Sequence, residues 1–230
     1  MCVPAMHLGL DCSTQSLKAV VVDERLAILC SEQVNYDADL PHFGTEFGVH
    51  ARGSGRVTQP PRMWTEALDM VLCRLRDRHG VSFDRIVSVS GAGQQHGSVY
   101  WRRGAAEQLS EFSSLQPLAE QIEPCLARLE SPIWMDSSTA SECAALEGSV
   151  GGPAELASIT GSRAHERFTG NQIAKLYKEE PDMMHSCERI SLVSSFMASL
   201  FLGRIAPIDW ADGSGMNLLD LHTKEWCVVN

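Results

Sequence analysis

Residues 8–18 read Leu-Gly-Leu-Asp-Cys-Ser-Thr-Gln-Ser-Leu-Lys. In this stretch an apolar run ends on Asp11, turns through small polar residues, and resumes at Leu17 beside the cation Lys18. The β-branched residues around it and the short polar gaps predict strands over 6–11, 17–23 and 26–36, with a tight hairpin between the first two. Three strands in quick succession therefore open the fold.

Helical and strand-like segments alternate along the rest of the chain. Apolar residues at helical spacing predict an amphipathic helix from Arg62 to His79. We expect further helices from a cap within 136–139 to residue 146, and at 153–159, 170–180 and 190–202. Short strands are expected at 85–90 and 132–135, with 97–101 continuing the first of them, a loop with one short hairpin at 41–61, and a final hairpin at 212–215. This order predicts an α/β domain whose mixed sheet is flanked by helices.

The composition describes an ordinary acidic globular chain. Of its 230 residues 44% are apolar, and 19 Lys and Arg against 29 Asp and Glu give a net charge of −10. That balance, with no block of basic residues, argues against nucleic acid as a partner. Residues 190–203 form an uncharged stretch of 14 residues that includes four serines. A membrane span needs about 20 apolar residues, so we expect no membrane anchor.

The cysteines indicate a reducing compartment. Eight of them are spread along the chain without a Cys-x-x-Cys pair, which suggests neither a zinc site nor a small disulfide scaffold. The first six residues contain no basic region followed by an apolar stretch, so no signal peptide is expected. We therefore expect a cytoplasmic protein with reduced thiols.

The hairpin at 11–18 carries the parts of a phosphate-binding site. Its backbone N–H groups and its hydroxyls can donate hydrogen bonds to phosphoryl oxygens, and Lys18 adds positive charge. Asp11 can hold a hydrated Mg²⁺, an ion that commonly keeps its waters and takes only one or two carboxylates. The alternative is a hairpin whose polar tip is only solvated.

Two further segments offer contacts to a ligand. The loop Gln94-Gln95-His96-Gly97 combines donors and acceptors, a mixture that suits a polyhydroxylated ligand. The alternative for His96 is an imidazole satisfied within the fold. Asp136 follows an expected strand, at the end where open α/β sheets bind ligands, but it is also a candidate helix N-cap.

Taken together, these segments resemble the FGGY carbohydrate kinases, and within that family the eukaryotic members that act on xylulose. The resemblance extends over essentially the whole chain. It rests on five sequence blocks that follow one another in the order expected for the family. They are Asp11–Lys18, Gly91–Ser98, Ile133–Thr139, Glu166–Ile173 and Asp212–Asn217. One departure is Ser13, which stands where many members have glycine.

The resemblance implies a two-domain, actin-like fold related to ribonuclease H, with ATP in the cleft and a sugar held mainly by the first domain. Substrate contacts would come from Gln95, His96, Arg167 and Asp136. The ATP phosphates would face Thr14, Gln15, Ser16 and Lys18. Asp11 would bind Mg²⁺. The implied reaction is the ATP-dependent phosphorylation of D-xylulose to D-xylulose 5-phosphate.

One family feature is missing from these 230 residues. Members carry the catalytic base in a Gly-Asp-Asn block and build the adenine pocket in a C-terminal portion, and neither is found here. The resemblance therefore implies that residues 1–230 are an N-terminal sugar-binding domain, with the catalytic base expected downstream of Asn230 and no catalytic residue before it. We expect the isolated chain to be inactive and its missing C-terminal domain to be its intramolecular partner.

Two alternatives remain open for the function. One is a kinase for another polyol or ketose, although glycerol kinases typically present an Arg-Glu pair where this chain has Gln95-His96. The other is a non-catalytic module that binds a sugar or nucleotide, which the absence of a base and adenine pocket favours for the isolated chain.

Overall fold

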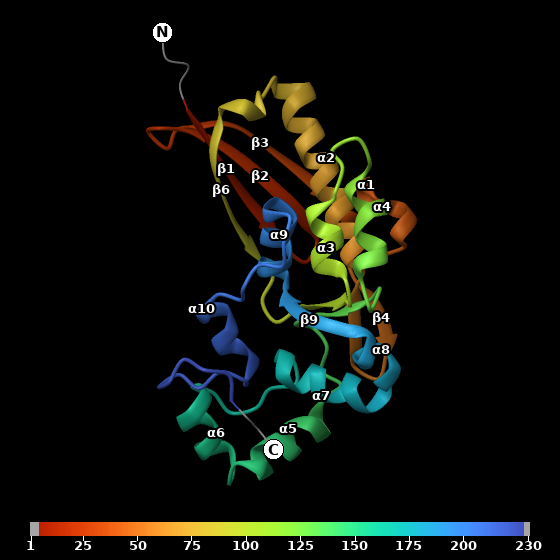
Figure 1. The fold of residues 1–230 in the computed structure, drawn as a ribbon, viewed down its shortest axis with the longest axis vertical. Helices are drawn as coiled ribbons and strands as arrows, with labels where there is room; N and C mark the ends of the chain where they lie inside the picture. Colours follow the sequence, from red (N-terminus) through yellow and green to blue (C-terminus); the bar gives the residue numbers. More distant parts are fainter. Residues whose placement is uncertain (1–4, 228–230) are drawn as a thin grey trace.

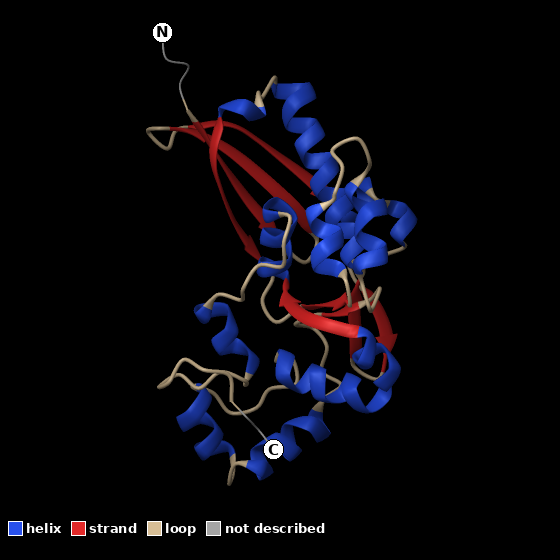
Figure 2. Cartoon of the chain, in the orientation of Figure 1, coloured by secondary structure: helices blue, strands red, loops and turns tan. Residues whose placement is uncertain are grey.

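A computed structural model of the chain describes residues 5–227. Its centre is a four-stranded sheet in the order β3-β2-β1-β6, built from β1 (Met6–Cys12), β2 (Ser16–Asp23), β3 (Ile28–Asn35) and β6 (Ile86–Gly93). β2 pairs antiparallel with both β1 and β3, while β6 runs parallel to β1. The three opening strands and the mixed sheet predicted from the sequence are therefore confirmed (Figures 1 and 2).

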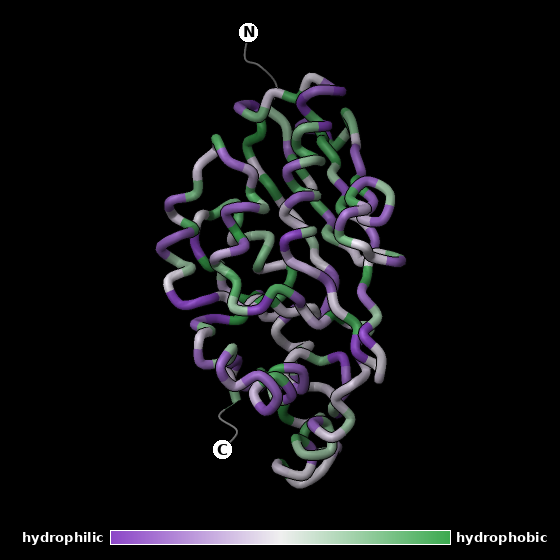
Figure 3. Tube along the Cα trace, turned by 90° about the vertical axis from the view of Figure 1, so that its right-hand side faces the viewer, coloured by the Kyte–Doolittle hydropathy of each residue, from purple (hydrophilic) through white to green (hydrophobic). Residues whose placement is uncertain are grey.

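The two faces of this sheet differ. Along β1 every second side chain is buried, including Leu8 and Leu10, and this face packs against α2 (Pro61–His79) and α9 (Val193–Leu202). Trp64 of α2 meets Phe196 of α9 edge to face, with ring centroids 6.0 Å apart. Apolar segments run through the interior of this upper part of the molecule (Figure 3). The other face carries Asp11 and lines an open groove.

A second region is built from segments before and after β6. The strands β4 (His50–Gly53), β5 (Arg56–Gln59) and β8 (Ser131–Pro132) form a small sheet, and β7 (Ser98–Arg102) pairs with β9 (Cys187–Leu192) in another. Short helices lie beside them: α1 (Tyr36–Asp39), α3 (Ala105–Ser110), α4 (Leu118–Ile122) and α8 (Pro181–Ser186). The predicted hairpin within 41–61 is thus confirmed as β4 and β5.

The lower end of the molecule in Figure 1 is helical. It contains α5 (Ala140–Ser149), α6 (Pro153–Thr160), α7 (Thr169–Glu179) and α10 (Trp210–Gly213). The helices predicted at 62–79, 153–159 and 170–180 agree with α2, α6 and α7 to within one residue at each end. Within residues 5–227 no helix is both long and apolar enough to cross a bilayer.

Four predictions of secondary structure were wrong. The strand expected at 132–135 is reduced to the two-residue β8, and residues 134 and 135 form a turn. Residues 97–101 do not continue β6, because the backbone turns at His96 and β7 enters a different sheet. The segment 190–202 begins as the end of β9 and becomes helical only at Val193. Instead of a hairpin at 212–215, α10 leads into a short 3-10 helix. Gly213 there has φ −61°, a right-handed helical value, and Asp209 caps the helix by accepting from the backbone N–H of Ala211.

Candidate functional site

A cavity of about 310 Å³ lies where the hairpin after β1 meets the loop after β6. Its walls come from four segments that are far apart in the sequence: the hairpin, the loop after β6, the residues after β8 and the loop before α7. The lining residues are Asp11, Ser13, Thr14, Gly93, Gln94, Gln95, His96, Trp134 and Arg167. The structure therefore brings together five of the residues that the sequence singled out, namely Asp11, Thr14, Gln95, His96 and Arg167.

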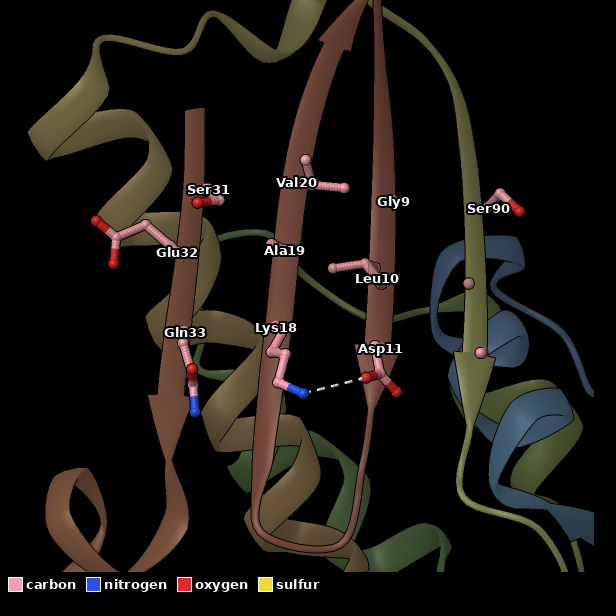
Figure 4. Close-up of a pocket in the computed structure, with 12 residues that line it drawn as sticks. Gly9, Leu10, Asp11, Lys18, Ala19, Val20, Ser31, Glu32, Gln33 and Ser90 are labelled. Carbon is pink, nitrogen blue, oxygen red and sulfur yellow. Dashed lines mark ion pairs between the residues drawn. The ribbon is translucent and has the colours of Figure 1, made fainter. Parts of the chain in front are cut away.

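Asp11 stands near the end of β1, on the open face of the sheet. Its Oδ2 accepts a hydrogen bond from Ser13 Oγ at 2.7 Å and lies 3.5 Å from Lys18 Nζ, its cross-strand neighbour on β2. About half of each side chain in this ion pair is exposed. Figure 4 shows the two side chains pointing toward each other across the strands. A carboxylate presented in this way is open to further ligands.

The single carboxylate limits which ion could bind here. In the described part of the chain no group of three or more His, Cys, Asp or Glu side chains could hold a metal by itself. Mg²⁺ does not need such a cage, since it is usually bound through one or two carboxylates, waters and the phosphates of a substrate. Asp11 therefore fits a hydrated Mg²⁺ that arrives with a phosphate chain.

The other residues predicted for ATP phosphates lie in different surroundings. Thr14 lines the cavity, whereas Lys18 lines a groove of about 880 Å³ on the open sheet face that Asp11 shares (Figure 4). The Gln15 side chain is exposed at the hairpin tip, while Ser16 is buried. The hairpin thus offers Thr14 and Lys18 on either side of Asp11.

The catalytic base was predicted to lie downstream of Asn230. Asn230 itself lies outside the described residues, which end at Cys227. The structure therefore does not test where the base lies, and its position stays a prediction.

His96 is held by contacts from three directions. Its backbone has φ +67°, and Thr169 Oγ1 donates to its carbonyl oxygen at 3.0 Å. Its ring stacks on Phe168, with centroids 4.6 Å apart, and its Nδ1 lies 3.1 Å from the Gly215 carbonyl oxygen. Because a carbonyl can only accept, Nδ1 carries the proton of the neutral ring and Nε2 is left as an acceptor.

The surroundings of His96 also favour its neutral form. Burial lowers the pKa of His96, and the positive charge of Arg167 adds to this shift, which exceeds the opposing effect of the contact with Gly215. At neutral pH the ring is therefore an uncharged acceptor beside the Arg167 guanidinium, which only donates. Together the two side chains offer complementary partners to a hydroxyl-bearing ligand.

Asp136 lies outside the cavity, unlike the three other residues predicted to bind substrate. It is 1% exposed, and its oxygens accept from Ser138 Oγ at 2.6 Å, from Gln172 Nε2 at 2.8 Å and from the backbone N–H of Val57 at 3.2 Å. Burial opposes its ionisation, but the hydrogen bonds from Ser138 and Gln172 hold its pKa below the usual value.

The contacts of Asp136 support the loop that carries Arg167. Gln172, which donates to Asp136, also donates to the carbonyl of Glu166 at 3.0 Å, and Thr139 Oγ1 donates to the same carbonyl at 2.6 Å. Thr139 occupies the N-cap position of α5 without capping it, since its hydroxyl is used here. Asp136 thus helps to fix the backbone at Glu166, next to Arg167, and does not contact the cavity itself.

Some site residues gave little or no signal in the sequence. Trp134 lines the cavity, and its Nε1 donates to Thr14 Oγ1 at 2.9 Å. It belongs to the block Ile133–Thr139 that the resemblance had marked, where nothing indicated this bond. Phe168 belongs to a block that the resemblance had marked, without a role of its own. Gln59 had no signal, because a glutamine at the end of a short strand is usually a surface residue.

Comparison with known proteins identifies the family of this domain. Residues 6–114 match the N-terminal domain of the FGGY family of carbohydrate kinases, a segment that includes Asp11, Thr14, Gln95 and His96. Residues 6–114 are an FGGY N-terminal domain. It is 52% identical to xylulose kinase of Mus musculus over 220 residues, 95% of this chain and 40% of that protein. With xylulose kinase 2 of Arabidopsis thaliana the identity is 49%, over 96% of this chain and 40% of the relative.

Solved structures confirm the fold expected for an FGGY kinase. The xylulose kinase of Rhodospirillum rubrum superposes with a TM-score of 0.75 at 15% identity, over 97% of this chain and 39% of that one. The glycerol kinase of Plasmodium falciparum, solved with ADP, gives 0.69 at 18% identity, over 97% and 40%. The mixed sheet with flanking helices is that of the actin-like sugar kinases. The chain spans about 40% of the length of the relatives it matches.

Proposed function

We propose that residues 1–230 are the sugar-binding N-terminal domain of an ATP-dependent xylulose kinase, which converts D-xylulose to D-xylulose 5-phosphate. The observation that carries this proposal is the cavity in which Thr14 and Asp11 of the hairpin face His96 and Arg167. Identities near 50% with xylulose kinases, along almost the whole chain, support D-xylulose as the sugar.

In this proposal the sugar lies against the loop after β6. His96 Nε2 accepts a hydrogen bond from one hydroxyl, the Arg167 guanidinium donates to another oxygen, and the Gln95 amide can do either. Ligand oxygens that lose water on binding thereby regain partners of the correct type, which is how a polar pocket achieves specificity.

The hairpin would face the phosphates. Phosphoryl transfer depends mostly on alignment and charge stabilisation, so the protein needs donors and cations near the transferred group. Lys18 supplies the cation, and Thr14, Gln15 and Ser16 of the same hairpin are the other proposed phosphate residues. Mg·ATP, when bound, supplies the phosphoryl group and neutralises part of its charge, and Asp11 would hold the waters of the metal ion.

A sugar hydroxyl also needs a proton acceptor at the moment of transfer. Asp11 is the only carboxylate among the described residues that line the cavity, and we assign it to the metal. We therefore place the general base, with the adenine pocket, downstream of Asn230 in a C-terminal domain that complements residues 1–230. The compartment we propose is the cytoplasm, since the seven described cysteines are free thiols.

Binding and turnover of the 230-residue chain test this proposal together. We expect calorimetric titration to show binding of D-xylulose, with weaker binding of D-ribulose and glycerol, and we expect no xylulose 5-phosphate after incubation with Mg·ATP. Preference for another polyol would favour a kinase of different specificity. Sustained formation of the product by pure chain would contradict the assignment of the base to another domain.

A further inference from the structure

Gln59, the last residue of β5, is fully buried and its amide is saturated with hydrogen bonds. Its Nε2 donates to the carbonyl oxygen of Thr14 at 2.6 Å and to that of Gly48, and its Oε1 accepts from Gln94 Nε2. Because the two carbonyls can only accept, the orientation of the Gln59 amide is determined by its neighbours.

These bonds are part of a closed ring of three residues. Gln59 donates to the Thr14 carbonyl, Thr14 Oγ1 lies 3.5 Å from Gln94 Oε1, and Gln94 Nε2 donates back to Gln59. Trp134 Nε1 donates to Thr14 Oγ1, which leaves the hydroxyl proton of Thr14 free to point at Gln94. Every donor in the ring therefore faces an acceptor, and such connected bonds in a buried site strengthen one another.

The ring joins the two halves of the cavity. Thr14 belongs to the hairpin after β1 and Gln94 to the loop after β6, and both line the cavity, whereas Gln59 lies outside it. The segment that contains Gly48 packs closely against the hairpin. A Cβ added to Gly48 would lie only 2.9 Å from Gln15 Cα. Only glycine fits there, and its φ of +78° suits glycine as well.

We propose that Gln59 is a positioning residue that sets the spacing between the hairpin after β1, which carries Thr14, and the loop after β6, which carries Gln94. It does so by orienting the Thr14 hydroxyl and the Gln94 amide, without touching a ligand itself. This inference rests on the proposed function in so far as the cavity is taken to bind D-xylulose. The ring itself is a property of the chain and can be tested without the sugar.

A double-mutant cycle tests whether Gln59 acts through Gln94. D-Xylulose is titrated by calorimetry into the wild-type chain, Gln59→Met, Gln94→Met and the double variant, with Gln116→Met, at an exposed glutamine outside the cavity, as the matched control. We expect each single variant to lose about tenfold in affinity, the double variant to lose no more than either, and the control to be unchanged. Independent, additive losses, or an unchanged affinity in Gln59→Met, would overturn the proposal.

A second measurement separates the ring from the proposed function. In NMR spectra of the chain without ligand, the side-chain NH₂ of Gln94 should be protected from exchange, and Gln59→Met should abolish that protection. Thr14→Val, at the half-buried end of the ring, should also shift the Gln94 NH₂ resonances. This variant provides the test if Gln59→Met does not fold. Unchanged Gln94 signals in these variants would refute the ring even if D-xylulose binds. A wild-type chain that fails to bind D-xylulose but shows the protected NH₂ would refute only the proposed sugar.

Discussion

The ring of His96 is stacked on the ring of Phe168, with centroids 4.6 Å apart and planes 28° apart, although the two residues lie far apart in the chain. Thr169, the next residue, donates to the His96 carbonyl and so ties the same two segments together. The start of α7 thus holds the backbone of His96 in the left-handed conformation, which turns the chain after β6 away from the main sheet. Fold and site depend on each other at this point.

The left-handed backbone at His96 restricts what can replace it. Asparagine tolerates φ near +67°, whereas a β-branched residue is strained there. We expect His96→Val to lower the free energy of unfolding by about 1–2 kcal/mol more than His96→Asn, as measured in urea. Equal stabilities of the two variants would show that the backbone conformation at this position is different.

We propose that the hairpin with the Asp11–Lys18 ion pair binds phosphates rather than sugar. Asp11→Ala removes the proposed anchor of the hydrated Mg²⁺ but none of the proposed sugar contacts. In the full-length kinase we therefore expect calorimetric titration to show Mg·ATP binding weakened about tenfold or more, while the dissociation constant for D-xylulose changes less than about twofold. Glu24→Gln, an exposed carboxylate outside the cavity, is the control. Loss of sugar binding with unchanged Mg·ATP binding would reverse the assignment.

The buried pair of Asp136 with Lys175 predicts how the chain responds to acid. Lys175 Nζ lies 3.4 Å from Asp136 Oδ1, and both side chains are more than nine-tenths buried. Asp136→Asn leaves a buried ammonium without its counter-charge, which should cost about 3 kcal/mol at pH 7. Chemical denaturation measures this cost, and Lys175→Met in the same chain should recover part of it.

The pH dependence follows from the pKa of Asp136, which is lower in the folded than in the unfolded chain. Such a carboxylate contributes stability above its unfolded pKa of about 3.9, and the contribution is lost as pH falls through the folded value. The difference in stability between wild type and Asp136→Asn should therefore be full at pH 6 and shrink below about pH 4. A difference that is independent of pH would contradict the ionised state of Asp136.

The edge of the main sheet predicts self-association of the isolated chain. β6 is one of the two edge strands of the main sheet, its Val87 and Val89 are 63% and 44% exposed, and Phe201 and Leu202 of α9 are exposed beside it. An apolar cleft of about 310 Å³ lies between this strand and α9. Open edges with apolar side chains pair with other chains. Light scattering should show concentration-dependent oligomers that Val89→Lys suppresses; a wild-type monomer at all concentrations would count against this.

Much of the fold could be predicted because its signals are local. The three opening strands and α2 follow from patterns within a few residues of each other, and they agree with the structure. The strand at 97–101 was assigned to the wrong sheet, because the turn at His96 depends on Phe168 and Thr169, far along the chain. The supposed hairpin at 212–215 depended on glycines that take ordinary helical conformations instead.

The site residues also divide into those that the sequence indicated and those whose role depends on distant segments of the chain. Asp11, Thr14, Gln95, His96 and Arg167 stood out by residue type or by resemblance, and the structure gathers them around one cavity. Asp136 was assigned to the sugar because it follows a strand, but its partners Gln172 and Lys175 lie more than 35 positions away and bury it. The role of Gln59 is visible only in three dimensions, since its partners come from three other segments.

Titration of D-xylulose into the wild-type chain, His96→Ala and Arg167→Ala, with melting curves of the same samples, tests the central claim most directly. If these two side chains hold the sugar, each substitution should weaken binding about tenfold to a hundredfold, because each leaves a buried hydrogen-bonding partner unsatisfied at a cost of about 1–3 kcal/mol. The melting temperature of Arg167→Ala should hardly change, since the guanidinium faces the cavity, whereas His96→Ala also loses the stacking on Phe168 and the contact with Gly215 and should melt somewhat lower. Unchanged affinity in both variants, or lost stability with unchanged affinity, would show that neither residue belongs to a sugar site.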